Sequence, residues 1–345
     1  MIFTQKLIGS TKLYLRNTHV SHCPIINLTG RKERDLEGIL HGVMKNLLPY
    51  FRKSEDFHGI WTNARTHGTG GPIRIQLPEY TGMGDIYVKA AGELGYPRQD
   101  LNGYFTEGFD TIYYPMKGGR RHGVYGAFIE EAMLNLDKRL TVRQFAQATR
   151  AAKEVILSAG AMISPQLLML SGIGPKEHLQ ELGIEVRADL PVGNNLQDHI
   201  SAYLGPFFVN KPIAFSIERD VTSVSVANFL VQGRGILTTS GTNAMGFFAS
   251  EHAKARGQGD WPDVQIILAG VSVGENFAKD FARGFGVKRR VLERYWAHAV
   301  GKDSFLQIVS LGRPRQRELY DSRTFDYKNL QAKSFGKFLR KPRLS

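Results

Sequence analysis

The alternation of apolar and polar positions predicts a chain of short helices and strands joined by glycine-rich turns. Residues 37–56, EGILHGVMKNLLPYFRKSED, place apolar side chains near helical spacing. PIRIQLP at 72–78 alternates like a short strand, and GMGDIYVKAAGELGYP at 82–97 predicts a helix that ends at Gly95 and Pro97. This mixture, without an internal repeat, favours an α/β or α+β fold over repeat or all-helical architectures.

The segment KEVILSAGAMISPQLLMLSGIG, residues 153–174, combines three local patterns. The apolar run 155–157 is typical of a strand buried on both faces. Ser164 followed by Pro165 predicts a helix start, because serine caps free amides and proline suits the first turn. The stretch SGIGP then predicts the end of that helix.

Four small residues, Ser158, Ala159, Gly160 and Ala161, lie where the predicted strand meets the predicted helix. Missing side chains let another group approach the backbone closely, and free amides near a helix start favour an anion such as a phosphate. Tight packing of the strand against the helix explains the same residues without any ligand. The local pattern leaves these two interpretations equal.

The charge of the chain is uneven. The net charge is +13, and residues 311–345 contribute ten basic and three acidic side chains to it. Such a tail is typical of a solvated surface segment, with binding to nucleic acid or an anionic membrane as the weaker interpretation, because no recognition module accompanies it. No apolar run reaches the roughly 18 residues that a membrane-spanning helix needs.

Metal and disulfide chemistry receive no support from the sequence. The single cysteine, Cys23, excludes an internal disulfide framework and a four-thiolate metal site. No pair of His, Cys or acidic residues has metal-ligand spacing of any weight. Ser171 lies in LSGIG and not in Gly-x-Ser-x-Gly, which argues against a nucleophile elbow.

The string EVILSAGAMISPQLLMLSGIGPKEHLQELGI, followed by LPVGNNLQDH, resembles the second signature of the glucose–methanol–choline (GMC) oxidoreductases. Within that family it is most similar to the animal glucose-dehydrogenase-like branch. Eight residues fall on signature positions: Gly160, Ser164, Pro165, Leu168, Leu170, Ser171, Gly172 and Gly174. Blocks such as HGTGGPI, AAGELGYP, KGGRRH and DWPDVQ follow the family's order and extend the resemblance over roughly residues 42–312.

The resemblance implies an α/β (mixed α+β) fold, with a partial, doubly wound FAD-binding domain interleaved with a substrate-binding domain on an antiparallel sheet. It implies an FAD-dependent oxidoreductase that oxidises the CH–OH group of a small alcohol or sugar by hydride transfer to the flavin. Ser158, Ala159, Gly160, Ala161 and Ser164 are then expected near the FAD diphosphate. The expected divisions are an unassigned segment (1–36), a partial FAD-binding region (37–200), a substrate-binding region (201–312) and a basic tail (313–345).

The chain also departs from the family pattern. No complete Gly-x-Gly-x-x-Gly occurs in the sequence, and the family's catalytic histidine and its partner have no counterpart here. We therefore expect that the amino-terminal dinucleotide-binding unit and the carboxy-terminal catalytic region are missing, that this polypeptide binds FAD weakly or not at all, and that no catalytic residue can be assigned. The substrate, the electron acceptor and the compartment stay open.

Two alternatives to an enzyme remain. A non-catalytic ligand-binding or scaffold protein derived from the family would keep the substrate-binding half and turn over no alcohol. A nucleic-acid- or membrane-associating protein would act through the basic tail and ranks last, so we expect no nucleic-acid partner.

The remaining histidines and nearby arginines favour structural roles. His67 in HGTGGP is expected to stabilise a tight loop, and His199 is expected to fill a polar corner beside Asp198. Arg120 and Arg121 are typical of solvated surface charges. The role of His122, in GRRHGVYG, stays open.

Overall fold

The computed structural model describes residues 41–62, 65–103, 107–134, 142, 154–194, 200–260 and 262–311. Contacts divide the chain into two units. Of the described residues, the larger unit contains 41–134 and 200–311, and the smaller contains 142 and 154–194. The chain therefore leaves the larger unit and returns to it. The four-part division expected from the sequence stays a prediction.

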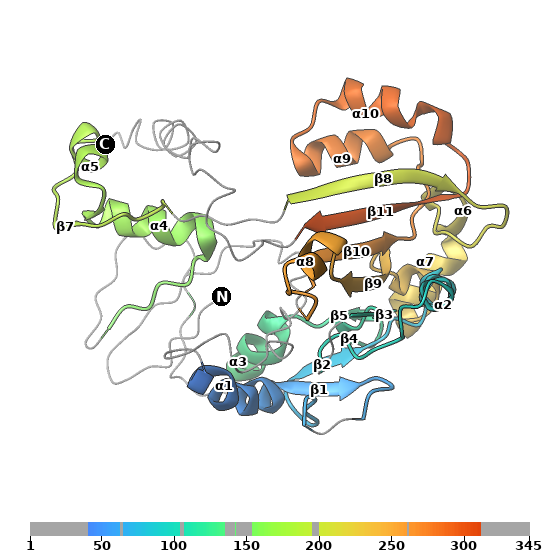
Figure 1. Cartoon of the computed structure of the whole chain (residues 1–345), viewed down its shortest axis with the longest axis horizontal. Coiled ribbons are helices and arrows are strands. Elements are labelled where there is room, and N and C mark those ends of the chain that lie inside the picture. Colours follow the sequence, from blue (N-terminus) through green and yellow to red (C-terminus); the bar gives the residue numbers. More distant parts are fainter. Residues whose placement is uncertain are drawn as a thin grey trace. The chain divides into compact units, whose positions relative to one another are not determined.

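A five-stranded antiparallel sheet forms the centre of the larger unit (Figure 1). Its strand order is β3-β9-β10-β11-β8. The bounds are β3 Gly108–Thr111, β9 Thr242–Phe248, β10 Val264–Ala269, β11 Ser304–Leu311 and β8 Ile200–Phe208. The apolar runs VQIILA and SFLQIVSL form β10 and β11, two of the three inner strands. Helices and this sheet together confirm the mixed α/β class with an antiparallel sheet.

Helices cover both faces of this sheet. Successive side chains of a strand point to opposite faces, so neighbouring residues of β11 contact different helices. Leu306 of β11 packs into a core with Ala278 of α9 (Phe277–Phe285) and with Leu292 and Trp296 of α10 (Arg289–Trp296). Its neighbour Phe305 packs against a second core that includes Met83 and Val88, at α2 (Gly84–Glu93). In the view of Figure 1, α9 and α10 lie above β8 and β11, and α2 lies below them.

A second sheet of the larger unit has the order β1-β2-β4-β5. It contains β1 Glu55–His58, β2 Ile73–Gln76, β4 Tyr114–Lys117 and β5 Arg120–Arg121. Its β1 and β2 pair in parallel, and the other pairs are antiparallel. The remaining elements of this unit are α1 His41–Ser54, the π-helix η2 Tyr125–Glu130, α3 Glu131–Leu134, α6 Ile217–Asp220, α7 Ser223–Gln232, η3 Ile236–Thr238, α8 Glu251–Ala255 and η4 Ala297–Ala299.

Three local predictions are confirmed within the described residues. The helix expected in 37–56 is α1, and the strand expected in 72–78 is β2. The helix expected in 82–97 is α2, which ends at Glu93 with Leu94 as its C-cap, and Gly95 follows with a φ of 90°. Each of these segments carries its pattern locally, so tertiary context did not need to override it.

The smaller unit contains α4 Gly160–Leu170, β6 Ile173–Gly174, α5 Lys176–Glu181 and β7 Ala188–Asp189. The strands β6 and β7 pair in parallel around α5. Met169 and Leu179 are its most buried apolar side chains among the described residues. Parallel pairing in the described part of this unit is limited to this short strand pair.

Two predictions about this unit are wrong. Residues 155–157 do not form a buried strand: Val155 is 66% exposed, and no described strand pairs with this segment. Without a neighbouring strand, an apolar run has neither ladder hydrogen bonds nor a packed face to hold it extended. The helix expected to begin at Ser164 begins instead at Gly160, so Pro165 lies inside α4 and removes one helical hydrogen bond.

No described helix is both long enough and apolar enough to cross a membrane. Within the same residues, no group of three or more His, Cys, Asp or Glu side chains could hold a metal ion.

Candidate functional site

The backbone at the start of α4 is accessible and has an unusual conformation. Ala159 is the N-cap residue, and no side chain caps the helix there. Gly160 has a φ of 89°, a region that favours glycine, and a Cβ added to it would meet no atom within 4 Å. Gly160 and Ala161 are both exposed. The small residues at this point therefore leave open space beside the main chain.

Ser164 holds this bend from inside the helix. Its Oγ accepts a hydrogen bond of 3.0 Å from the backbone N–H of Ala159. The Ser164 hydroxyl therefore binds the N-cap residue of α4. It does not cap a helix that starts at Ser164, as the sequence had predicted. Ser158 is half-buried beside it. The five residues expected at a cofactor thus lie within one short segment of a single unit.

The first turn of an α-helix directs backbone N–H groups outward and carries a partial positive charge. At α4 these groups belong to residues without bulky side chains, and the N-cap residue supplies no side-chain acceptor. An anionic group could therefore approach the amides of Gly160 and Ala161 without steric obstruction.

The small residues at the other end of α4, Ser171 and Gly172, are explained by packing and not by space for a ligand. A Cβ on Gly172, whose φ is 83°, would lie 2.4 Å from the backbone oxygen of Glu185. The Gly172 carbonyl also accepts hydrogen bonds from the N–H groups of Arg187 and Ala188. Ser171 donates its hydroxyl to the Leu167 carbonyl at 2.8 Å, which is consistent with the argument against a nucleophilic role. Packing explains this end of the helix.

His67 is a buried histidine in the larger unit, 6% exposed, between two carboxylates. Its Nδ1 lies 3.2 Å from Glu55 Oε1, and its Nε2 lies 3.0 Å from Asp100 Oδ2. Burial works to lower the pKa of His67, but hydrogen bonds and charge from Asp100 and Glu55 outweigh it and raise this pKa to about 9. Glu55 also accepts from the Gly68 N–H at 2.8 Å. These contacts agree with a loop-stabilising role.

Asp110 forms a second buried ionic cluster that the sequence did not single out. Its side chain accepts hydrogen bonds from Trp61 Nε1 at 2.6 Å and from Arg98 Nε at 2.8 Å. Burial raises the pKa of Asp110, and the bonds from Trp61 and Arg98 oppose that rise. The cluster joins segments that lie apart in the sequence, so no local pattern marks it.

The other singled-out residues of the larger unit do not form a catalytic group. Arg120 is exposed and donates to the Leu230 carbonyl at 2.6 Å. His122 precedes η2, and its Nδ1 is buried without a hydrogen-bond partner in the described part of the chain. Arg121 is exposed. His199, with Asp198, lies outside the described residues.

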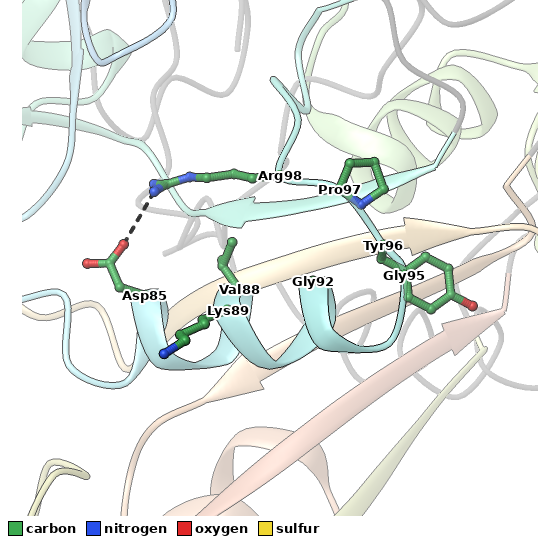
Figure 2. A pocket seen from close by; sticks show the side chains of 8 residues that line it. All are labelled: Asp85, Val88, Lys89, Gly92, Gly95, Tyr96, Pro97 and Arg98. Atoms are coloured by element: carbon green, nitrogen blue, oxygen red, sulfur yellow. Dashed lines mark ion pairs between the residues drawn. The ribbon is translucent and has the colours of Figure 1, made fainter.

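An open hollow of about 480 Å³ lies beside α2. Figure 2 shows that its walls come from α2 and the turn after it, with Arg98 opposite Asp85 at 3.6 Å. Arg98 is already bonded to buried Asp110, so one wall of the hollow is a structural ion pair. None of the five expected cofactor residues lines it.

Comparisons with known proteins place the α4 segment in a family context. Residues 136–201 match the sequence model described as GMC oxidoreductase. The chain is 34% identical over 262 residues to the oxygen-dependent choline dehydrogenase of Pectobacterium atrosepticum, covering 66% of this chain and 44% of that protein. It is 33% identical over 273 residues to the same-named protein of Pseudomonas putida strain F1, covering 70% and 47%. The chain thus spans about half the length of these curated relatives.

Solved structures with a similar fold share less sequence. A pyridoxine 4-oxidase from Mesorbium loti has a TM-score of 0.53 at 20% identity, covering 79% of this chain and 50% of that one. A formate oxidase from Aspergillus oryzae RIB40 has a TM-score of 0.57 at 21% identity, covering 78% and 53%. At these identities the likeness shows the fold.

Proposed function

Because the family model and the choline dehydrogenase relatives support the GMC oxidoreductase family for this chain, we propose that it forms part of an FAD-dependent oxidoreductase acting on the CH–OH group of a small alcohol. The observation that carries this proposal is that the family match and the accessible helix start lie in the same segment. The segment that matches the family includes the uncapped, glycine-opened start of α4.

The residues at the start of α4 fit the diphosphate of FAD. The formate oxidase with a similar fold is a protein in which FAD modification occurs. In this chain, the exposed amides of Gly160 and Ala161 would donate to diphosphate oxygens, and the 3.0 Å bond between Ala159 and Ser164 would keep the bend in place. Ser158, half-buried, would form the rim of the same turn.

The chemistry that FAD supplies when bound is acceptance of a hydride from the alcohol carbon. The contribution of this chain is then binding and orientation: the amides at α4 fix the diphosphate, which positions the flavin relative to the rest of the protein. We assign no general base. His67 is committed to two carboxylates.

The names of the relatives support a small alcohol as the substrate class. These relatives are choline dehydrogenases, and one structural neighbour is a pyridoxine 4-oxidase. We therefore infer an alcohol donor, with choline as the first compound to test. Membership of the animal glucose-dehydrogenase-like branch is a finer proposal, which predicts oxidation of glucose in place of choline.

The proposal is tested by titrating the purified chain with FAD and with ADP, following flavin fluorescence and heat of binding. Saturable binding of both ligands supports the site at α4, and its affinity also tests the expectation that this chain binds FAD weakly. Reduction of an artificial electron acceptor is then measured with choline and with glucose. Absence of saturable FAD and ADP binding, together with no turnover of either compound, would favour the non-catalytic scaffold protein.

A further inference from the structure

Helices α9 and α10 form a hairpin whose inner side is firmly packed in the larger unit. Phe281 meets Trp296 edge to face, with ring centroids 5.0 Å apart at 82°. Tyr203 of β8 makes a similar contact with Phe281 at 4.8 Å. These aromatic contacts fix the hairpin on the sheet, so its exposed side chains have defined positions.

The same hairpin also exposes large apolar side chains. Phe285, at the end of α9, is 60% exposed although its ring stacks on that of Phe281 with centroids 4.3 Å apart. Val287 in the following turn is 40% exposed. Val291 and Tyr295, four residues apart on α10, are 52% and 53% exposed. The Tyr295 hydroxyl donates to the Gly205 carbonyl at 3.0 Å, so the exposed ring is held in place. We call these four residues the apolar ridge.

Cationic side chains flank the apolar ridge. Residues 277–296 contain six basic and two acidic side chains, a net charge of +4. Arg289 pairs with Glu293 at 2.6 Å. The exposed cations Arg283, Lys288, Arg290 and Arg294 form no ion pair with another described residue. Arg290 and Arg294 immediately precede Val291 and Tyr295, so charge and apolar surface run side by side along α10.

The alternation of cationic and apolar side chains along α10 favours an anionic bilayer over an acidic protein as the partner. Protein interfaces tend to place apolar residues in a core from which charged residues are depleted, with the polar rim outside. An acidic protein would need carboxylates and apolar side chains alternating at the spacing of α10. An anionic bilayer offers phosphates above hydrocarbon at every point. Long arginine side chains reach the phosphates while shorter apolar ones enter the boundary below.

We propose that the apolar ridge and its flanking cations, on the α9–α10 hairpin, form a docking surface for an anionic lipid bilayer. The helices lie on the membrane surface and do not cross it. Phe285 and Val287 enter the acyl boundary at the turn, the Tyr295 ring lies at headgroup level, and Arg290 and Arg294 contact lipid phosphates. All of these residues belong to the larger unit, and the proposal does not depend on the proposed function.

The first test measures co-sedimentation of the full chain with phosphatidylcholine vesicles, with and without phosphatidylglycerol. Binding is expected only with phosphatidylglycerol and is expected to weaken with added salt. Each basic side chain near an anionic surface contributes about fivefold to the partition coefficient, so Arg290→Gln with Arg294→Gln should lower it by about 25-fold. The control, Lys117→Gln with Arg121→Gln, removes the same charge from exposed positions on β4 and β5.

The second test places a reporter in the turn. Val287→Trp should gain emission that brominated lipids quench, whereas Val231→Trp, on α7 at a position that is 83% exposed, should not. Equal loss of binding in the arginine and control variants, or no loss in either, would show that the hairpin does not provide the binding surface and would overturn the proposal. Equal quenching of the two tryptophans would overturn it as well. So would retention on polyglutamate beads without vesicle binding, which would indicate an acidic protein partner.

Discussion

The imidazole of His67 lies almost parallel to the ring of Phe57, with centroids 3.7 Å apart and an angle of 14° between the planes. This stacking covers one face of a histidine whose two nitrogens face Glu55 and Asp100. Arg52 approaches from α1, donating its Nε–H to the His67 carbonyl at 3.3 Å. The loop after β1 is therefore joined to three other segments through one residue.

This cluster predicts a stability that depends on pH. The pKa of His67 is raised from 6.5 to about 9 in the folded protein. A raised folded pKa means that the stabilisation is fully present below pH 6.5 and is lost as the pH rises through about 9. The shift corresponds to about 3 kcal/mol of unfolding free energy. Urea unfolding at a series of pH values between neutral and mildly alkaline should show this loss.

His67→Gln is the informative variant, because glutamine does not titrate and should flatten the pH dependence over that interval. His58→Gln serves as its control. His58 also lies beside an acid, Asp56 at 2.8 Å, but its side chain is 41% exposed, where water screens the pair. If the parent and His67→Gln lose stability equally as the pH rises, the cluster does not hold a proton as described.

The two carboxylate partners of Arg98, Asp110 and Asp85, should contribute different amounts to the unfolding free energy. Arg98 pairs with Asp110, whose side chain is 2% exposed, and with Asp85, which is 67% exposed. Asp110→Ala leaves Trp61 and Arg98 without their shared acceptor and should lower the unfolding free energy by about 3 kcal/mol. Asp85→Ala should cost less than about 1 kcal/mol. Chemical denaturation of both variants measures the difference, and equal costs would contradict the buried pair.

The local elements of the larger unit were predictable where one segment carries its own pattern. The helices α1 and α2 and the strand β2 follow from spacing, glycine and proline within a few residues. The antiparallel sheet came only from the family resemblance, because β3 and β9 pair although they lie far apart in the sequence. No local periodicity specifies such a pairing.

Other features were missed for identifiable reasons. Trp61 and Asp110 are 49 residues apart, so their bond leaves no sequence pattern. The hairpin of α9 and α10 did leave one: Phe277, Phe281 and Phe285 recur at every fourth residue, the spacing of one helix face. Residues 155–157 misled because an apolar run indicates a strand only where neighbouring strands are present to pair with it.

At the candidate cofactor site, the sequence predicted the residues but not the geometry. The small side chains beside Gly160 were visible, and the resemblance assigned them to FAD. The positive φ of Gly160 and the reach of Ser164 back to Ala159 were not visible, since both depend on where α4 begins. The assignment of Ser158, Ala159, Gly160, Ala161 and Ser164 to the cofactor stays a proposal.

Ala161→Glu tests that proposal through two readouts that should move in opposite directions. A glutamate in the first turn of α4 complements the helix dipole and should raise the unfolding free energy by about 0.5 kcal/mol. The same carboxylate would repel a diphosphate at the amides of Gly160, so FAD and ADP should bind at least about tenfold more weakly, a cost of about 1.4 kcal/mol. Gln180→Glu, exposed on α5, adds the same charge away from this helix start. Thermal unfolding and ligand titration of both variants give the answer: unchanged ligand affinity in Ala161→Glu would exclude the start of α4 as the diphosphate site, whatever its effect on stability.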